Sequence, residues 1–180
     1  MLIRPGAAHE VAEAYRYALT ETELPVVLAL SRDAVPTLDR TKYAPASGVQ
    51  KGGYVLADAA AGGDPEVILI GTGTELPKCV EAFEQLQADG IKARVVSLPS
   101  WDMFQKQDAA YRDSVIPKRV KARVCVEMGS TFGWERYAGE TGAIIGMTFW
   151  ATSAPSKELQ KHYGFTVEAI VTAAKAQAGR

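Results

Sequence analysis

The stretch from Val67 to Glu75 shows the clearest pattern of hydrophobic positions in the chain. Its four consecutive apolar residues, Val67 to Ile70, are typical of a strand buried on both faces, as in the middle of a parallel sheet. A glycine turn at 71–73 follows, and apolar side chains then recur at spacings of three and four until Asp89-Gly90. This order predicts a strand, a tight turn and an amphipathic helix, which together begin a βαβ unit.

The rest of the chain alternates in the same way between strand and helix patterns. Further strands are expected at 25–30, 53–57, 91–97, 121–127 and 142–147, with a small-residue turn at 59–63. Further helices are expected at 10–20, 101–104, 108–116, 131–138, 155–162 and 166–178. Such alternation predicts an α/β fold, with a mostly parallel sheet and helices on its faces.

The pattern breaks between residues 36 and 53. Proline and glycine interrupt this stretch repeatedly and no period survives, so it is expected to be a linker. We place a boundary near residues 45 to 50, which divides the chain into residues 1–45 and residues 46–180.

Charge and composition exclude several classes of protein. Twenty basic and 21 acidic residues give a net charge of -1, so neither a nucleic acid nor a membrane surface is an expected partner. No apolar run approaches the roughly 20 residues that span a bilayer. The start of the chain lacks the apolar region of a signal peptide, so we expect a cytoplasmic protein. Cys79 and Cys125 are too few for a disulfide framework or a zinc site and are expected to be packing residues.

The glycine turn invites a dinucleotide-binding interpretation, because it stands between a strand and a helix. Leu76 occupies the third glycine position of that fingerprint, and the next strand ends without an acidic residue for a ribose hydroxyl. We therefore expect a structural turn, with Thr74 capping the helix and Pro77 in its first turn.

Histidine and acidic residues offer few catalytic candidates. His9 and His162 are the only histidines, and both fall at predicted helix ends, where surface or capping roles are expected. Four glutamates on polar helix faces are expected to be solvated, namely Glu81, Glu84, Glu158 and Glu168. Glu127 differs, because it ends a buried strand at the carboxyl edge of the sheet. It is either a site or interface residue or a partner in a structural hydrogen bond.

Arg32 is the best-placed single residue. It follows the predicted strand 25–30, and ligands of open α/β sheets bind at the carboxyl ends of the strands. Its planar guanidinium, with the hydroxyl of Ser31 beside it, can hold a phosphate. The alternative is a salt bridge to Asp33 or Asp39.

Several segments, in order and over nearly the whole chain, resemble the C-terminal part of transketolase. They are Val95–Trp101, Lys106–Val115, Glu127–Trp134, Gly142–Met147, Ser153–Pro155 and Tyr163–Thr166. The resemblance implies that residues from about 50 onward form an α/β domain with a five-stranded mixed sheet, in which Gly53 to Leu56 is the antiparallel member. It implies that residues 1–45 are the last helix and strand of a pyrimidine-binding domain, followed by the start of the linker.

The resemblance also implies a function. Transketolases use thiamine diphosphate and Mg²⁺ or Ca²⁺ to move a two-carbon ketol unit between sugar phosphates in the pentose phosphate pathway. The family's cofactor, metal and catalytic motifs are missing from this sequence, so no catalytic, cofactor-binding or metal-binding residue is expected here. The isolated chain is expected to be inactive. Its expected partners are the remaining transketolase domains or a second chain that carries them, with a homodimer as the complete enzyme.

Within the resemblance, Leu30-Ser31-Arg32 matches the family motif whose arginine grips the sugar phosphate, which assigns that role to Arg32. The sequence departs from the family at Asp33-Ala34, where glutamine and asparagine are common, and at Trp150, where glycine is common. A carboxylate beside the guanidinium opposes anion binding. Residues 127–137 and an exposed apolar face of residues 1–45 are expected to contact partners.

Two other interpretations stay open. The chain can be a free-standing α/β binding or regulatory module, whose cleft near Gly71, Ser97 and Gly129 holds a small ligand. It can also be the C-terminal domain of another thiamine enzyme, such as an acyl-transferring dehydrogenase subunit or a deoxyxylulose-phosphate synthase, although these fit the motifs less well.

Overall fold

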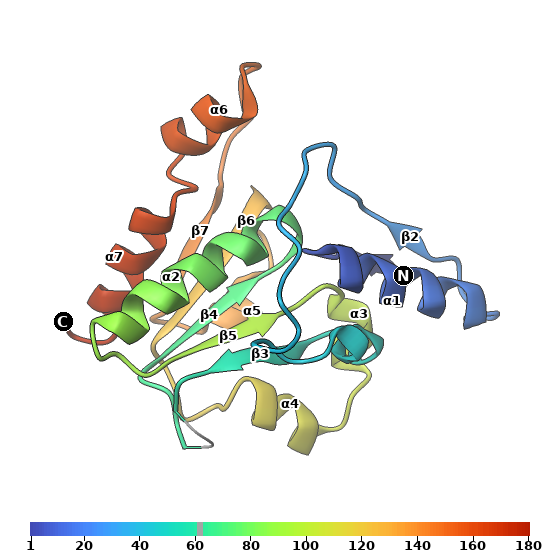
Figure 1. Ribbon diagram of the computed structural model, residues 1–180, viewed down its shortest axis with the longest axis horizontal. Helices are drawn as coiled ribbons and strands as arrows, with labels where there is room; N and C mark the ends of the chain where they lie inside the picture. The colour runs from blue at the N-terminus through green and yellow to red at the C-terminus, as the bar shows by residue number, and fades with distance from the viewer. Residues whose placement is uncertain (61–62) are drawn as a thin grey trace.

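A five-stranded sheet forms the centre of the molecule in the computed structural model, which describes residues 1–60 and 63–180. Its strands run in the order β3-β5-β4-β6-β7, with β4 in the middle (Figure 1). They are β3 (Tyr54–Asp58), β4 (Val67–Gly71), β5 (Ala93–Ser97), β6 (Arg123–Ser130) and β7 (Ala143–Met147). All neighbours pair in parallel except β3, which lies antiparallel to β5 at one edge. The predicted mostly parallel sheet is confirmed, including its one antiparallel strand.

Helices cover both faces of this sheet because the side chains of a strand alternate between its faces. Leu69 of β4 belongs to one hydrophobic core, which also contains side chains of α2 (Leu76–Ala88) and α7 (Val167–Gln177). Ile68 and Ile70 belong to the other core, together with side chains of α3 (Trp101–Gln105), α4 (Ala109–Val115) and α5 (Glu135–Ala138). The continuous apolar run at 67–70 is thus explained by burial on both sides. In contrast, α6 (Ser156–His162) has no buried residue and stands apart from the sheet (Figure 1).

The turn between β4 and α2 is structural, as predicted, but its details differ. Gly73 has a φ of 55°, a left-handed conformation that favours glycine. A Cβ on Gly71 would lie 2.9 Å from the Sγ of Cys79, so glycine lets the helix pack closely on the strand. The predicted cap at Thr74 is wrong. A short 3₁₀ helix, η2 (Gly73–Glu75), precedes α2, and Glu75 stands at the N-cap position without a side-chain cap bond. Pro77 lies in the first turn of α2, as predicted.

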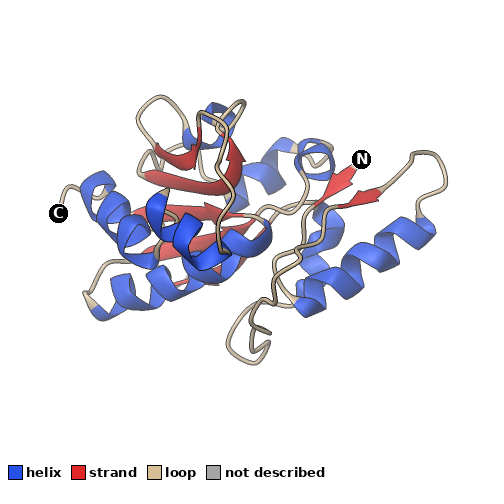
Figure 2. Ribbon diagram, turned by 90° about the horizontal axis from the view of Figure 1, so that it is seen from above, coloured by secondary structure: helices blue, strands red, loops and turns tan. Residues whose placement is uncertain are grey.

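The N-terminal segment adds a second, two-stranded sheet. β1 (Leu2–Ile3) pairs in parallel with β2 (Val27–Leu28), and α1 (Ala8–Thr20) connects them. The predicted strand at 25–30 is thus only two residues long, because β1 is its one strand partner among the described residues and is equally short. Figure 2 shows β1, β2 and α1 grouped beside the larger sheet.

The stretch at 36–53 is more ordered than a linker. It contains a 3₁₀ helix, η1 (Ala46–Lys51), whose Val49 is fully buried in the same core as Ile3 and Leu69. Gly52 ends η1 with a φ of 78°, and a Cβ there would lie 2.3 Å from the backbone nitrogen of Phe104. The division of the chain into residues 1–45 and 46–180 stays a prediction.

Two further boundaries differ from the sequence-based expectations. β6 extends to Ser130, so Glu127 lies within the strand, and α5 is correspondingly shorter than the helix predicted at 131–138. The small-residue turn expected at 59–63 includes residues 61 and 62, which lie outside the described residues.

Cys79 and Cys125 are both fully buried, as predicted, and burial raises the pKa of both thiols. In the described part of the chain, no helix is both long and apolar enough to cross a membrane.

Candidate functional site

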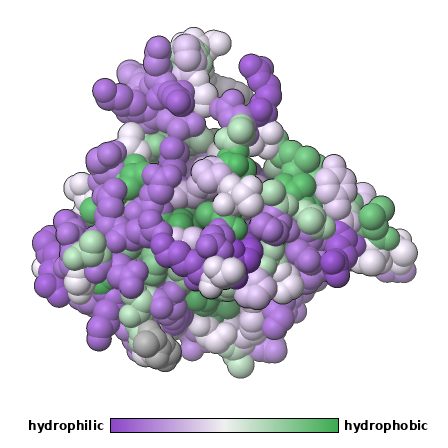
Figure 3. All heavy atoms as spheres, viewed as in Figure 1, coloured by the Kyte–Doolittle hydropathy of each residue, from purple (hydrophilic) through white to green (hydrophobic). Residues whose placement is uncertain are grey.

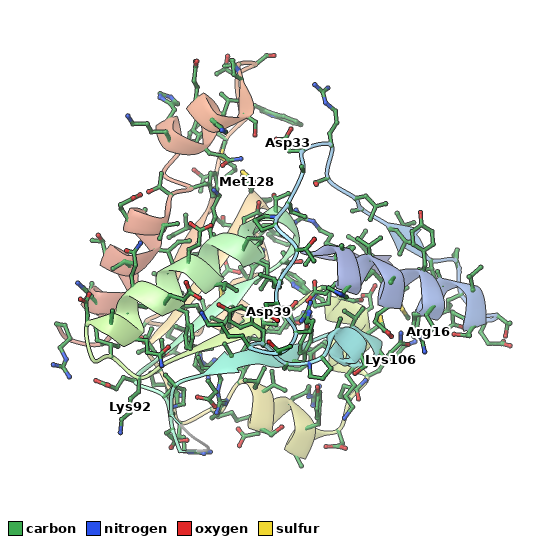
Figure 4. All side chains as sticks on the ribbon, viewed as in Figure 1. Arg16, Asp33, Asp39, Lys92, Lys106 and Met128 are labelled. Atoms are coloured by element: carbon green, nitrogen blue, oxygen red, sulfur yellow. The ribbon has the colours of Figure 1, made fainter. Side chains whose placement is uncertain are left out.

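Arg32 lies in the loop that follows β2, and its side chain is exposed. This loop borders an open pocket of about 780 Å³, whose other walls come from the start of α2, from Met128 of β6 and from α6. In Figure 4, Asp33 marks the tip of the loop on the side where α6 lies, and Met128 is below it. The carboxyl end of β6 and two helices thus meet the loop that carries Arg32.

The alternative of a salt bridge for Arg32 finds no support in the described residues, where no ion pair within 4 Å joins Arg32 to Asp33 or Asp39. Asp39 instead accepts hydrogen bonds from the backbone N–H of Thr41, at 2.9 Å, and from its hydroxyl, at 2.7 Å. These bonds lower the pKa of the Asp39 carboxyl. The hydroxyl of Ser31 donates to the backbone oxygen of Asp33 at 2.5 Å, which shapes the loop.

The pocket beside Arg32 is balanced in charge. Its lining holds three cationic and three acidic side chains, namely Arg32, Lys78, Lys157, Asp33, Glu81 and Glu158. An anion entering it meets no strong overall field, so recognition depends on the local fork of the guanidinium. The phosphate-binding role of Arg32 stays a prediction.

A second group of charged side chains meets at the carboxyl ends of β4 and β6, and sequence reasoning missed two of its three members. Arg4 donates a hydrogen bond from Nη1 to Oε1 of Glu127, and its Nη2 lies 3.6 Å from Oε2 of Glu75. Glu75 is fully buried and Glu127 is buried. Burial raises the pKa of both carboxyl groups, and the charge of Arg4 opposes that shift.

The backbone of Arg4 is held as firmly as its side chain. Its N–H donates to the carbonyl of Pro99 at 2.7 Å, and its carbonyl accepts from the N–H of Gly73 at 3.1 Å and from the hydroxyl of Thr72 at 3.2 Å. The N–H of Gly73, which a pyrophosphate-binding turn would present to its ligand, is therefore already used inside the protein. This contact supports the structural interpretation of the turn at 71–73 over the dinucleotide interpretation.

Glu127 also borders a pocket of about 460 Å³ at this edge, together with Arg4, Thr72, Trp101 and Gly129. The pocket lies where a cleft near Gly71, Ser97 and Gly129 was expected. The ion pair with Arg4 gives Glu127 a partner within the chain, and its role in a site or interface stays a prediction.

Glu10 is the third charged residue that sequence reasoning missed. It is fully buried and accepts hydrogen bonds from the N–H of Gly6 (2.7 Å), the hydroxyl of Tyr54 (2.6 Å) and the hydroxyl of Ser97 (2.7 Å). Burial, followed by the nearby charge of Glu10, raises the pKa of Tyr54. This carboxylate ties α1 to β3 and β5.

The remaining sequence candidates lie at the surface, as predicted. His9 and His162 are exposed, and so are Glu81, Glu84, Glu158 and Glu168. Within residues 1–60 and 63–180, no group of three or more histidine, cysteine, aspartate or glutamate side chains is arranged to hold a metal ion.

The fold is that of an α/β domain with a mostly parallel sheet and one antiparallel edge strand. Two pockets lie at the carboxyl ends of its strands. A family model described as the transketolase-like TK C-terminal domain matches residues 52–166. The chain therefore belongs to the transketolase family, and it corresponds to the C-terminal portion of that family's longer chains.

Individual relatives agree with this assignment. Transketolase 7 from Craterostigma plantagineum is 47% identical over 177 residues, which are 97% of this chain and 26% of the relative. A transketolase structure from Leishmania mexicana matches with a TM-score of 0.89 and 33% identity, over 99% of this chain and 25% of that one. A transketolase from Pichia stipitis, solved in complex with sedoheptulose 7-phosphate, matches with a TM-score of 0.86 and 32% identity over the same shares. The chain thus spans about a quarter of the length of these proteins.

Proposed function

We propose that this chain is the C-terminal portion of a transketolase, which transfers a two-carbon ketol unit between sugar phosphates with thiamine diphosphate as cofactor. The match of the family model to residues 52–166 carries this proposal. The chain contributes subunit architecture and the arginine that binds the substrate phosphate. Catalysis takes place only when the remaining domains, on the same polypeptide or on a second chain, are present.

The cofactor belongs to those other domains. The described residues offer no ligand set for the Mg²⁺ or Ca²⁺ that accompanies thiamine diphosphate. The three carboxylates buried near the N-terminal segment are also engaged, because Arg4 contacts Glu75 and Glu127 while Glu10 accepts three internal hydrogen bonds. The cofactor chemistry of the proposed reaction therefore belongs to residues of the other domains.

Arg32 is the proposed contact to the sugar phosphate. Its place in Leu30-Ser31-Arg32, its exposure and the open pocket beside it support this role. The relative from Pichia stipitis, solved in complex with sedoheptulose 7-phosphate, supports a sugar phosphate as the ligand class. Asp33 follows directly, so its carboxylate weakens the attraction for a phosphate.

The exposed apolar side chains of the N-terminal segment are the proposed contact to the missing domains and, in the complete enzyme, to a homodimer. They are Leu2, Tyr15, Leu19, Leu24, Val27 and Leu30. Figure 3 shows hydrophobic surface on the side of the molecule where α1 and β2 lie. Phe132, which is 87% exposed, adds an apolar contact from the segment 127–137. The cytoplasm is the proposed location, although several relatives are named chloroplastic transketolases.

A coupled assay tests the proposal. The 180-residue chain, given xylulose 5-phosphate, ribose 5-phosphate, thiamine diphosphate and Mg²⁺, is expected to show no ketol transfer. Addition of a transketolase fragment that supplies the missing domains is expected to restore turnover. Turnover by the chain alone, with thiamine diphosphate bound to it, would overturn the proposal.

A free-standing binding module is the second candidate function, and the pocket of about 460 Å³ beside Glu127 favours it. Calorimetry separates the two. The module predicts tight binding of a nucleotide or another small molecule in the pocket beside Glu127, which Arg32→Ala leaves unchanged. The transketolase portion predicts a weak sugar-phosphate contact at Arg32, and Arg32→Ala removes that contact.

A further inference from the structure

A small basic pocket lies at the opposite end of the sheet from Arg32. Its volume is about 240 Å³, and α4, α5 and the first residue of β6 contribute to its walls. Figure 1 shows α4 and α6 at opposite ends of the molecule. Four cationic side chains line the pocket and face a single carboxylate; they are Arg112, Lys118, Arg123 and Arg136, and the carboxylate is that of Asp113.

Arg123 brings a buried positive charge to this pocket. It is 8% exposed, and its guanidinium donates to the carbonyl oxygens of Val120 (2.8 Å), Tyr137 (2.9 Å) and Pro117 (2.8 Å). Among the described residues, no carboxylate lies within 4 Å of it. Burial lowers the pKa of Arg123, and the charge of Asp113 opposes that shift without cancelling it. Carbonyl groups satisfy its hydrogen bonds but do not neutralise its charge.

Asp113 supplies only part of the missing negative charge, because its carboxylate is shared with other donors. One of its oxygens accepts the backbone N–H of Lys118 at 2.9 Å, and the other lies 3.6 Å from Nη1 of Arg119. Arg112 uses Nη1 to hold the backbone oxygen and Oε1 of Gln105, at 3.0 and 3.1 Å. Its Nε and Nη2 make no hydrogen bond with the described residues and remain able to donate to a ligand.

We propose that this pocket binds a compact phosphate-bearing anion, held by Arg112 and the exposed Arg136, with the buried charge of Arg123 in the same pocket wall. Several guanidinium groups around one small cavity repel each other, and an anion removes that repulsion. The planar donor fork of arginine matches the oxygens of a phosphate. Phe104 and Tyr137 give the pocket an aromatic wall, which suits a phosphate monoester with a small organic group. This site is separate from Arg32 and does not depend on the proposed activity.

Calorimetric titration of the full 180-residue chain with inorganic phosphate at low ionic strength tests the site. Arg112→Gln and Arg136→Gln are each expected to weaken binding at least tenfold. Arg16→Gln is the matched control, since it removes one exposed guanidinium from α1, a helix that contributes no residue to the pocket. Figure 4 labels Arg16 on α1. Arg16→Gln is expected to leave binding at this pocket unchanged. Arg32→Gln is also expected to leave binding at this pocket unchanged and to remove only the weak contact at Arg32, which separates the two sites. Arg123 is left intact, because its loss would unpair three buried carbonyl groups.

Ribose 5-phosphate is the second ligand in the same experiment. Tighter binding of ribose 5-phosphate than of inorganic phosphate, lost in Arg112→Gln, would identify a monoester as the preferred ligand. Equal affinities lost in Arg112→Gln would identify the free anion. The proposal is overturned if no heat of binding is seen with either ligand, if Arg16→Gln weakens binding as much as Arg112→Gln, or if only Arg32→Gln abolishes it.

Discussion

Arg4 donates a hydrogen bond to Glu127 across 123 residues of sequence, and the same guanidinium lies 3.6 Å from Glu75. The side chain of Glu75 is fully buried, that of Glu127 is 9% exposed and that of Arg4 is 26% exposed. One cation thus compensates two carboxylates in a partly desolvated place, and it links the N-terminal segment to the carboxyl edge of the sheet. Because it serves both carboxylates, its loss affects more than one ion pair.

Arg4→Met is expected to destabilise the chain by about 3 kcal/mol, because it leaves two buried carboxylates without their cation. Urea unfolding at pH 7 measures the change. The control is Arg16→Met, which removes a mostly exposed arginine 3.7 Å from Glu13 and is expected to change stability by less than about 0.5 kcal/mol. The double variant Arg4→Met with Glu127→Gln is expected to recover part of the loss. Equal effects of Arg4→Met and Arg16→Met would contradict this account of the cluster.

The pH dependence of stability is expected to show the burial of Glu75. Burial raises its pKa above the usual value of 4.5. The folded state then holds the proton more tightly than the unfolded state, so ionisation above pH 4.5 costs folding free energy. We therefore expect the wild-type chain to lose stability relative to Glu75→Gln as the pH rises from about 4.5 to the raised pKa, and the difference to stay constant above it.

Glu84 provides a control of opposite sign. Hydrogen bonds from Lys42 and Tyr43 lower its pKa below 4.5. Its contribution to stability is therefore present above pH 4.5 and lost as the pH falls through the lowered pKa. Urea unfolding of wild type, Glu75→Gln and Glu84→Gln between pH 3 and 8 measures both slopes. If the unfolding free energies of wild type and Glu75→Gln change in parallel with pH, burial of Glu75 does not raise its pKa.

Glu10→Ala is expected to cost about 3 kcal/mol or more, since it leaves the N–H of Gly6 and the hydroxyls of Tyr54 and Ser97 without their acceptor in a buried place. Tyr54→Phe removes one of these donors and is expected to cost about 1 kcal/mol. His9→Ala, at the neighbouring exposed position on the same helix, is expected to have little effect. Hydrogen exchange along α1 should accelerate in Glu10→Ala but not in His9→Ala. Unchanged protection of α1 would show that this network does not hold the helix in place.

The central part of the fold could be predicted from the sequence because its signals are local. Burial of Val67 to Ile70 on both faces requires a continuous apolar run, and the packing of α2 requires apolar spacings of three and four, so both patterns are visible in sequence. β1 gives no such signal, because two residues show no period and their pairing with β2 depends on residues 25 positions away. The extension of β6 to Ser130 was missed for a similar reason, since its last residues are only partly buried.

The charged contacts could not be predicted because they depend on the finished fold. Glu10 meets Tyr54 and Ser97, which lie 44 and 87 positions away. In the sequence, Glu10 stands in a predicted helix beside other polar residues, just as the exposed glutamates do, so its burial gives no local signal. Arg4 and Glu75 are likewise brought to Glu127 by the order of the strands. In contrast, Arg32 could be proposed as a phosphate contact from the sequence, because its position after a strand and the motif around it are properties of consecutive residues.

The proposed role of Arg32 predicts the kinetics of a complete transketolase that contains this segment. Arg32→Ala is expected to raise the KM for ribose 5-phosphate by roughly 10- to 150-fold, the equivalent of a charge-assisted contact of about 1.5 to 3 kcal/mol. Asp33→Gln is expected to lower that KM, because it removes a negative charge beside the guanidinium. The control is a short aldehyde acceptor without phosphate, for which Arg32→Ala should leave KM unchanged. If Arg32→Ala raises the KM of both acceptors to the same extent, Arg32 supports the structure of the site and does not contact the phosphate.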